Sequence, residues 1–269
     1  MKLKNRVALV TGASPNIGGG IIEALAEAGA KIIAVDYVTA NAVECANYLN
    51  KTGGEAIGVT CDVADEAQVK SAVQAGIDAF GQIDILVNNA GYFNRKGALQ
   101  MSYAEWLQQS GVILGGTFLF TKYVAERMVE RGQGGNIINI ISTAGHQGEP
   151  NNVCYSTCKG GLLNMTRSTA MELSVHNIRV NSLTPTATDP TEQHERATRW
   201  GREAGTLPGG IYEFAKRVPL QRLPRPSDYG KAAVFLASDD ASMITGIDLR
   251  VDAGAVAKYW AWDPTTGVQ

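Results

Sequence analysis

Tyr155 and Lys159 are the residues in this sequence whose types and spacing most clearly suit acid–base chemistry. They are four positions apart, so in a helix both side chains lie on one face. A phenol with a pKa near ~10 is a poor base at neutral pH, but a nearby ammonium group lowers that pKa. The pair can therefore exchange a proton with an alcohol or a carbonyl oxygen. On these two residues alone, chance spacing on a solvated helix face is an alternative explanation.

Ser142 is the third candidate for this chemistry. It directly follows the apolar run 136–141, which predicts a strand, so its side chain is expected at the carboxyl edge of a sheet, where ligands bind in parallel α/β folds. A hydroxyl there can hold a substrate oxygen beside Tyr155. We therefore predict Ser142, Tyr155 and Lys159 as the catalytic residues.

A glycine-rich turn follows the first predicted strand, at residues 6–11, and precedes the first predicted helix, at 17–28. Glycine at such a turn lets the backbone approach a pyrophosphate, and the helix N-terminus supplies N–H donors and a positive dipole end. A purely structural turn is the alternative. The predicted phosphate-binding residues are Gly12, Ser14, Asn16, Ile17 and Gly18.

Asp36 ends the second predicted strand, 18 residues after Gly18. A carboxylate there accepts hydrogen bonds from the adenosine ribose hydroxyls and repels a 2′-phosphate, so it favours NAD over NADP. No Arg or Lys occurs between Asp36 and Glu44 to reverse that preference. Asp62 and Val63 end the third predicted strand in the same layer and are expected to cap the adenine ring. A solvated acid at a strand end is the alternative reading of Asp36.

Apolar runs alternate with helical patterns along the whole chain. This alternation predicts a doubly wound parallel sheet of about seven strands with helices on both faces, a Rossmann fold in one domain over 1–269. The proline-rich segment 184–226 is too long for an ordinary connection, and we predict that it is a substrate lid with short helices of its own. The aromatic stretch 259–264 is expected to pack against the body of the protein or a neighbouring subunit. The predicted strands are 6–11, 31–36, 55–61, 83–88, 136–141, 178–183 and 248–251, and the predicted helices are 17–28, 40–51, 65–80, 102–131, 155–176 and 228–238.

The charge balance and the apolar pattern exclude several classes of protein. Acidic residues outnumber basic residues by 26 to 24, which argues against a nucleic-acid partner. No stretch approaches the ~20 apolar residues needed to span a bilayer, and the first residues lack the apolar core of a signal peptide, so we expect a cytoplasmic protein without a membrane partner. The three histidines are far apart and the four cysteines lack zinc-ligand spacing, so we expect no metal site.

The order and spacing of these motifs resemble those of the short-chain dehydrogenase/reductase family, in its classical NAD-dependent type, from about residue 5 to residue 254. The motifs that carry the resemblance are Thr11-Gly12 with Gly18, Asp62-Val63, Asn88-Asn89-Ala90-Gly91, Ser142, and Tyr155 with Lys159. The resemblance implies hydride transfer between NAD(H) and a small secondary alcohol or ketone, with Tyr155 as the general acid and base.

The resemblance also implies further cofactor contacts and an assembly. Asn89, Ala90 and Gly91 are expected beneath the adenosine side of the cofactor, and the backbone of Thr188 beside the nicotinamide carboxamide. Tyr155 and Lys159 are expected at the nicotinamide end, where the lysine binds the ribose. A homotetramer is expected, in which the two predicted long helices, 102–131 and 155–176, pair across subunits.

Two departures from the family pattern affect these expectations. Asn16 stands where the family usually has glycine, and we expect it to be accommodated because Asn tolerates a left-handed backbone. Ile113 stands where the family often has an asparagine that helps to hold a water beside the lysine, so the proton relay is altered or absent. A non-catalytic NAD-binding member of the family is therefore the second hypothesis. A dehalogenase-like member is disfavoured by Asp36 and Lys159, which a protein of that kind is expected to lose.

Overall fold

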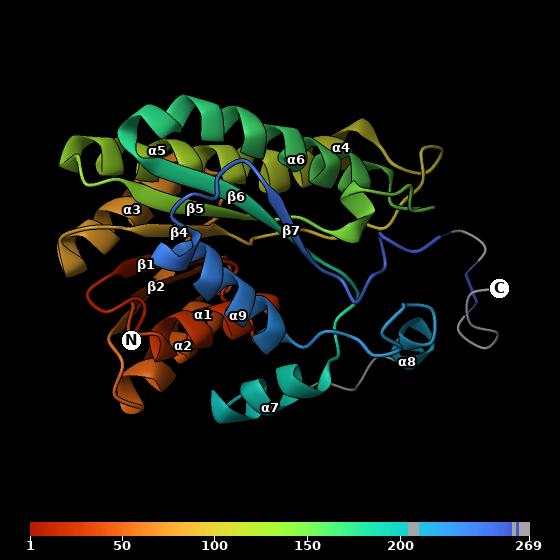
Figure 1. Ribbon diagram of the computed structural model, residues 1–269, viewed down its shortest axis with the longest axis horizontal. Helices are drawn as coiled ribbons and strands as arrows, with labels where there is room; N and C mark the ends of the chain where they lie inside the picture. Colours follow the sequence, from red (N-terminus) through yellow and green to blue (C-terminus); the bar gives the residue numbers. More distant parts are fainter. Residues whose placement is uncertain (204–209, 260–261, 264–269) are drawn as a thin grey trace.

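The computed structural model describes residues 1–203, 210–259 and 262–263, and within them seven parallel strands form one sheet in the order β3-β2-β1-β4-β5-β6-β7 (Figure 1). Its central strands are apolar runs covered on both faces, as parallel sheets require. The predicted strands are confirmed to within two residues at each end. Their bounds are β1 Val7–Thr11, β2 Lys31–Asp36, β3 Ala56–Thr60, β4 Ile85–Asn88, β5 Gly135–Ile140, β6 Ile178–Pro185 and β7 Asp248–Val251.

Helices cover both faces of this sheet, which confirms the doubly wound architecture (Figure 1). One layer packs with Ile21, Leu25 and Tyr229 on one side of the sheet, and the other packs with Val69, Phe120 and Val124 on the opposite side. The first layer consists of α1 Ile17–Glu27, α2 Thr39–Lys51 and α9 Pro226–Ala237, and the second of α3 Glu66–Phe80, α4 Tyr103–Ser110, α5 Gly116–Arg131 and α6 Val153–Leu173.

The predicted helix 102–131 is wrong as a single α-helix, because a π-helical turn at Gly111–Gly115 separates α4 from α5. The turn contains Ile113, whose carbonyl oxygen accepts a hydrogen bond from the Thr117 hydroxyl at 2.7 Å. Single π turns within helices occur frequently at functional sites. The predicted helix 155–176 begins two residues earlier than expected, and its last turn, Ser174–His176, is a 3₁₀-helix.

A chain of buried polar side chains links the middle of the sheet to α5 and α6. The amide of Asn88 on β4 donates to Asn139 on β5 at 2.9 Å and to Thr121 on α5 at 3.1 Å. The amide of Asn139 in turn donates to Thr166 on α6 at 3.0 Å. Buried polar groups require such partners, so this series of side-chain hydrogen bonds fixes the position of α6 relative to β5.

The segment 184–226 contains two short helices, α7 Thr191–Arg199 and α8 Ile211–Ala215, as predicted. Figure 1 shows α7 on the side of the molecule that carries α1 and α9. Residues 204–209 of this segment lie outside the described residues, as do 260, 261 and 264 of the aromatic stretch 259–264. Tyr259 is 65% exposed in the single chain, so most of its side chain does not pack against the body of the protein, and packing against a neighbouring subunit stays a prediction.

Within the described ranges, no helix combines the length and the apolar character that a bilayer crossing requires. Nor do those ranges contain three or more His, Cys, Asp or Glu side chains grouped so that they could hold a metal ion.

Candidate active site

The three predicted catalytic residues lie together at the carboxyl end of β5. Ser142 follows the strand, and Tyr155 and Lys159 lie one helical turn apart near the start of α6. A hydrogen bond joins the side chains of Ser142 and Tyr155. The Lys159 ammonium nitrogen lies 5.7 Å from the centre of the Tyr155 ring. A hydroxyl, a phenol and an amine are thus grouped as proton transfer to or from a bound oxygen requires.

Burial controls the ionisation of the Tyr155–Lys159 pair. Tyr155 is 7% exposed, and burial raises its pKa to about 12, with the Ser142 hydrogen bond opposing that rise. Burial lowers the pKa of Lys159 to about 8. The expectation of a lowered Tyr155 pKa is therefore wrong for the protein by itself, because the loss of hydration outweighs the Ser142 hydrogen bond and the charge of Arg95.

Lys159 and Ile113 lie at the inner wall of the site. The Lys159 ammonium donates to the carbonyl oxygen of Ile140 at 2.6 Å. Ile113 is fully buried in an apolar cluster that includes Ile141, Cys158 and Tyr155. The side chain at position 113 therefore contributes packing and no hydrogen bond beside the catalytic pair.

An aromatic ring that the sequence analysis missed covers Tyr155. The ring of Phe93 stacks on the Tyr155 ring, with centroids 4.6 Å apart and an interplanar angle of 29°. Phe93 is 60% exposed, and it lies two residues beyond the Asn89-Ala90-Gly91 motif, which is the only sequence signal for its position. The charges of Arg95 and Glu149 also reach the phenol, since Arg95 lowers and Glu149 raises its pKa. The mouth of the site is thus aromatic and charged.

The glycine-rich turn is closely fitted to the end of β4. Gly12 has a φ of 73°, and a Cβ atom on it would lie 2.8 Å from the Asn89 amide nitrogen. A Cβ on Gly18 would lie 1.9 Å from the Gly12 carbonyl oxygen, so both positions require glycine. Asn89 donates to the carbonyl oxygens of Thr11 and Gly12 at 3.0 and 2.8 Å, and the Thr11 hydroxyl accepts from the backbone N–H groups of Asn89 and Ala90.

Asn16 does not use the left-handed backbone that we expected. Its φ is −81° and its ψ −133°, so the replacement of glycine here needs no tolerance of positive φ. Among the described residues, the buried side-chain oxygen of Asn16 has no hydrogen-bond partner. The preceding carbonyl, that of Pro15, accepts a hydrogen bond from Arg196 at 2.9 Å.

Asp36 is buried at the end of β2, where it accepts hydrogen bonds from the Val38 N–H at 2.9 Å and the Asn41 amide at 3.0 Å. Burial raises the pKa of Asp36, and these two bonds and the charge of Arg202 oppose the rise. The Arg202 guanidinium also bonds Asn41 and lies 3.4 Å from Glu44. Arg202 is distant from Asp36 in the sequence, so the residues between Asp36 and Glu44 give no sign of this cation.

The remaining predicted cofactor residues are held by local contacts. The Asp62 carboxylate accepts from the Ala64 N–H at 2.9 Å. Val63 is buried against α5, since a Cβ on Gly116 would lie 2.6 Å from a Val63 methyl carbon. The Thr188 hydroxyl forms a hydrogen bond with the Tyr229 hydroxyl at 3.2 Å. The backbone N–H and C=O of Thr188 are the groups predicted to contact the nicotinamide.

These positions meet along one edge of the sheet. Strand order reverses between β1 and β4, and in doubly wound folds the crevice at such a reversal is the ligand site. The glycine-rich turn and Asn89 flank this crevice, with Asp36 on the side of β2 and Ser142 on the side of β5. The structure thus brings the predicted phosphate, ribose and catalytic residues to the same edge.

The chain is similar to known proteins over nearly its whole length. A sequence-family model described as enoyl-(acyl carrier protein) reductase matches residues 12–256. D-threitol dehydrogenase of Mycolicibacterium smegmatis is 38% identical over 96% of this chain and 95% of its own length. Galactitol 2-dehydrogenase of Agrobacterium fabrum is 36% identical over 94% of this chain and 98% of its own length. The crystal structure of a short-chain dehydrogenase/reductase from Burkholderia xenovorans superposes with a TM-score of 0.85 at 33% identity, over 96% of this chain and 99% of that one. The chain belongs to the short-chain dehydrogenase/reductase family.

As a short-chain dehydrogenase/reductase, the protein is an oxidoreductase acting on alcohols, and its family uses nicotinamide cofactors. The residues present fit such a dinucleotide. The glycine-rich turn leaves the backbone bare at Gly12 and Gly18, and the buried oxygen of Asn16 lacks a partner within the described residues. Within the described residues, both hydrogen bonds that Asp36 accepts go to one carboxylate oxygen, so the other oxygen is available for a ribose hydroxyl.

Proposed function

We propose that this protein is an NAD-dependent dehydrogenase that transfers a hydride between NAD(H) and a small secondary alcohol or ketone. The observation that carries the proposal is the grouping of Tyr155, hydrogen-bonded to Ser142, with Lys159 on the same face of α6. This grouping combines a proton donor or acceptor, an oxygen-binding hydroxyl and a cation, which are the groups that alcohol oxidation needs beside a hydride acceptor.

The residues divide the chemistry among them. The Ser142 hydroxyl holds the substrate oxygen, and Tyr155 takes the alcohol proton in oxidation or donates one to the carbonyl in reduction. Lys159 supplies positive charge that favours the tyrosinate form. A bound nicotinamide cofactor would supply the hydride acceptor and, in its oxidised form, a second positive charge. Phe93 covers the ring of Tyr155 and reduces its access to bulk water.

The substrate class that we propose is a small polyhydroxylated alcohol. D-threitol and galactitol, named in two relatives, are sugar alcohols. The charges of Arg95 and Glu149 reach the Tyr155 hydroxyl, and we propose that these two side chains hydrogen-bond further hydroxyls of a polyol. The exposed ring of Phe93 offers a flat apolar surface to the C–H face of such a molecule.

The test of the proposed function is the absorbance of reduced nicotinamide, followed with NAD and a panel of four- to six-carbon polyols and simple secondary alcohols. Turnover of any secondary alcohol in the panel supports the dehydrogenase, and a preference for polyols supports the substrate class. Binding of NADH without turnover of any alcohol or ketone would favour the non-catalytic alternative, for which the apolar cluster around Ile113 is the supporting observation.

We expect NAD(H) to be preferred over NADP(H), because the buried carboxylate of Asp36 would repel a 2′-phosphate. Arg202 does not reverse this preference, since its guanidinium is already engaged by Glu44 and Asn41. The measurement is kcat/KM with NAD(H) divided by kcat/KM with NADP(H). A higher kcat/KM with NADP(H) would contradict the assignment of Asp36. Asp36→Asn should lower this ratio.

Ketone reduction is expected to slow as the pH rises through about 8. Lys159, with its pKa lowered to about 8, carries a proton below that pH and loses it above. Tyr155, with a pKa of about 12, remains protonated over the same range. The check is kcat/KM for ketone reduction from pH 6 to 10. A rate that is constant to pH 10 would contradict this account, and Lys159→Arg, whose guanidinium stays charged, should give a profile without the fall.

We also propose a homotetramer. A groove of about 460 Å³ runs between α5 and α6, lined partly by Ala125, Val129 and Leu173, and Phe118 at its edge is 55% exposed. Large exposed apolar side chains along two parallel helices suit helix pairing between subunits. Light scattering at micromolar concentration should give four times the mass of the chain, and a monomeric mass would refute the assembly.

A further inference from the structure

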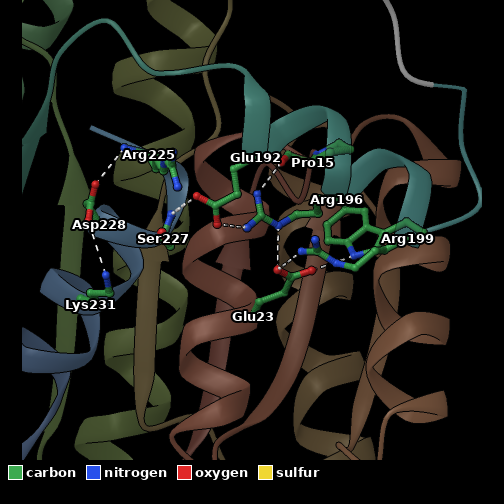
Figure 2. Close-up of polar contacts among 10 residues, drawn as sticks. Pro15, Glu23, Glu192, Arg196, Arg199, Arg225, Ser227, Asp228 and Lys231 are labelled. Atoms are coloured by element: carbon green, nitrogen blue, oxygen red, sulfur yellow. Dashed lines mark hydrogen bonds and ion pairs between the residues drawn. The ribbon is translucent and has the colours of Figure 1, made fainter. Parts of the chain in front are cut away.

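Arg196 is a buried cation in the segment 184–226. It lies on α7 and is 1% exposed. Its guanidinium makes three hydrogen bonds of 2.9 Å, from Nε to Glu23 on α1, from Nη1 to the carbonyl oxygen of Pro15, and from Nη2 to Glu192 one turn earlier (Figure 2). Each nitrogen of the guanidinium therefore has a partner, and one of those partners belongs to the glycine-rich turn.

The same contacts attach α7 to two helices of the cofactor side. Glu23 also accepts from Arg199 at 2.9 Å and from the Trp200 indole at 3.1 Å. Glu192 accepts from the backbone N–H of Ser227, at the start of α9, at 3.1 Å (Figure 2). Buried charges are costly unless they are paired, so these contacts hold α7 in one place.

Packing against α1 leaves no space beneath α7. A Cβ atom on Gly19 would lie 2.6 Å from the Arg196 side chain and 2.9 Å from the Trp200 ring. The first turn of α1, whose N–H groups form the anion-binding end of the helix, is therefore in direct contact with α7. Just beyond α7, Arg202 reaches Asn41 and Glu44 on α2, so a second attachment lies beside Asp36.

The bond from Arg196 to Pro15 orients a peptide group of the phosphate-binding turn. In a planar trans peptide the C=O and the N–H point in opposite directions. Because the Pro15 carbonyl is turned toward Arg196, the N–H of Asn16 is turned away from α7. A carbonyl released from this bond can rotate its oxygen toward a bound phosphate, which would repel it. The turn contains Pro15 and Asn16. A hydrogen bond from Arg196, 181 positions away in the sequence, holds its conformation.

We propose that Arg196 is a positioning residue of the cofactor site, and that α7 is a fixed wall of that site instead of part of a lid that opens for substrate. The inference rests on the proposed function, because it takes the glycine-rich turn as the site of a nicotinamide dinucleotide. The inference divides the predicted lid, 184–226, into two parts. The first part then serves the cofactor, and only the part after residue 202 is left to serve the substrate.

The experiment compares the wild type with Arg196→Met and Arg196→Lys. The readouts are the Kd for NADH from fluorescence titration, KM and kcat for the alcohol at saturating NAD, and the midpoint of thermal unfolding. Arg196→Met should weaken NADH binding about tenfold or more, the order expected for a misplaced binding group, with kcat at saturating NAD changed less than about twofold. Arg196→Lys keeps the charge but not the three-way geometry, so it should weaken NADH binding to an intermediate degree.

Arg199→Met is the matched control, because Arg199 bonds the same Glu23 but does not contact the turn. It should leave the Kd for NADH within about twofold of the wild type. If Arg196→Met misfolds, the uncharged triple variant Glu23→Gln, Arg196→Met, Glu192→Gln removes the arginine without leaving buried carboxylates, and it should show the same weakened binding.

Three results would overturn the inference. Wild-type NADH affinity in the Arg196 variants, with only a lower unfolding midpoint, would make the residue purely structural. A raised KM for the alcohol with an unchanged Kd for NADH would return α7 to the substrate lid. Failure of the wild type itself to bind NADH would reject the proposed function, and this inference with it.

Discussion

Tyr155→Phe should abolish turnover while leaving the affinity for NADH nearly unchanged. The substitution keeps the ring that stacks on Phe93 and removes only the hydroxyl that bonds Ser142. Loss of general acid–base catalysis typically costs ~10²–10⁴-fold in rate. The measurement is kcat for the best alcohol in the panel, together with the Kd for NADH by fluorescence titration.

Tyr103→Phe is a suitable control, because the Tyr103 side chain is 75% exposed at the start of α4. It should turn over at the wild-type rate. Wild-type turnover in Tyr155→Phe would show that another group transfers the proton, and the mechanism proposed above would then be wrong. Weakened NADH binding together with lost turnover would point to a disturbed fold.

Lys159→Met should reduce kcat by ~10²–10³-fold, comparable to the loss of one positioned donor at a reacting oxygen. The Lys159 ammonium lies 5.7 Å from the centre of the Tyr155 ring, and the charge of Arg95 also reaches the phenol. Methionine preserves most of the volume in this buried position, so packing against Ile140 should survive. The change would be measured as kcat and as the pH profile of ketone reduction.

A result above a tenth of wild-type kcat for Lys159→Met would show that the lysine is dispensable. This prediction holds although Ile113 supplies no amide beside the lysine. The π-helical turn at Gly111–Gly115 brings irregular backbone to this wall of the site, and main-chain oxygens there can hold a water where a side chain cannot. We therefore expect lysine to remain essential while the route of the proton differs from that in relatives with asparagine.

The sheet could be predicted from the sequence because its signals are local. A parallel strand covered on both faces is a continuous apolar run, as β1 and β4 are, and all seven predicted strands lie in the sheet of the described residues. The glycine-rich turn could also be predicted from the sequence. Gly12 and Gly18 are required because neighbouring atoms leave no room for a Cβ atom, and Gly12 also has a positive φ. The spacing of Tyr155 and Lys159 was sufficient to place both on one helix face.

The rest depends on contacts between distant residues. Nothing near Pro15 indicates that Arg196 holds its carbonyl, and nothing near Asp36 indicates Arg202, because the segment that carries both arginines is placed by tertiary packing. The ionisation of Tyr155 was misjudged for a related reason. Spacing showed a neighbouring amine, but only the packed structure shows how completely the phenol is removed from water.

The strand order bears on how this chain can fold as it is synthesised. β1, β2 and β3 pair in sequence, β4 joins the free side of β1, and each later strand of the described sheet joins the one made before it. No strand has to be inserted between two that are already paired, so the sheet can grow at its edges as the ribosome extends the chain, N-terminal part first. The strands that carry the glycine-rich turn, Asp36 and Asn89 are complete before Tyr155 is synthesised. A nascent chain can therefore pair β1 to β4 before it acquires Tyr155 and Lys159, while the contact from Arg196 to the glycine-rich turn forms only later.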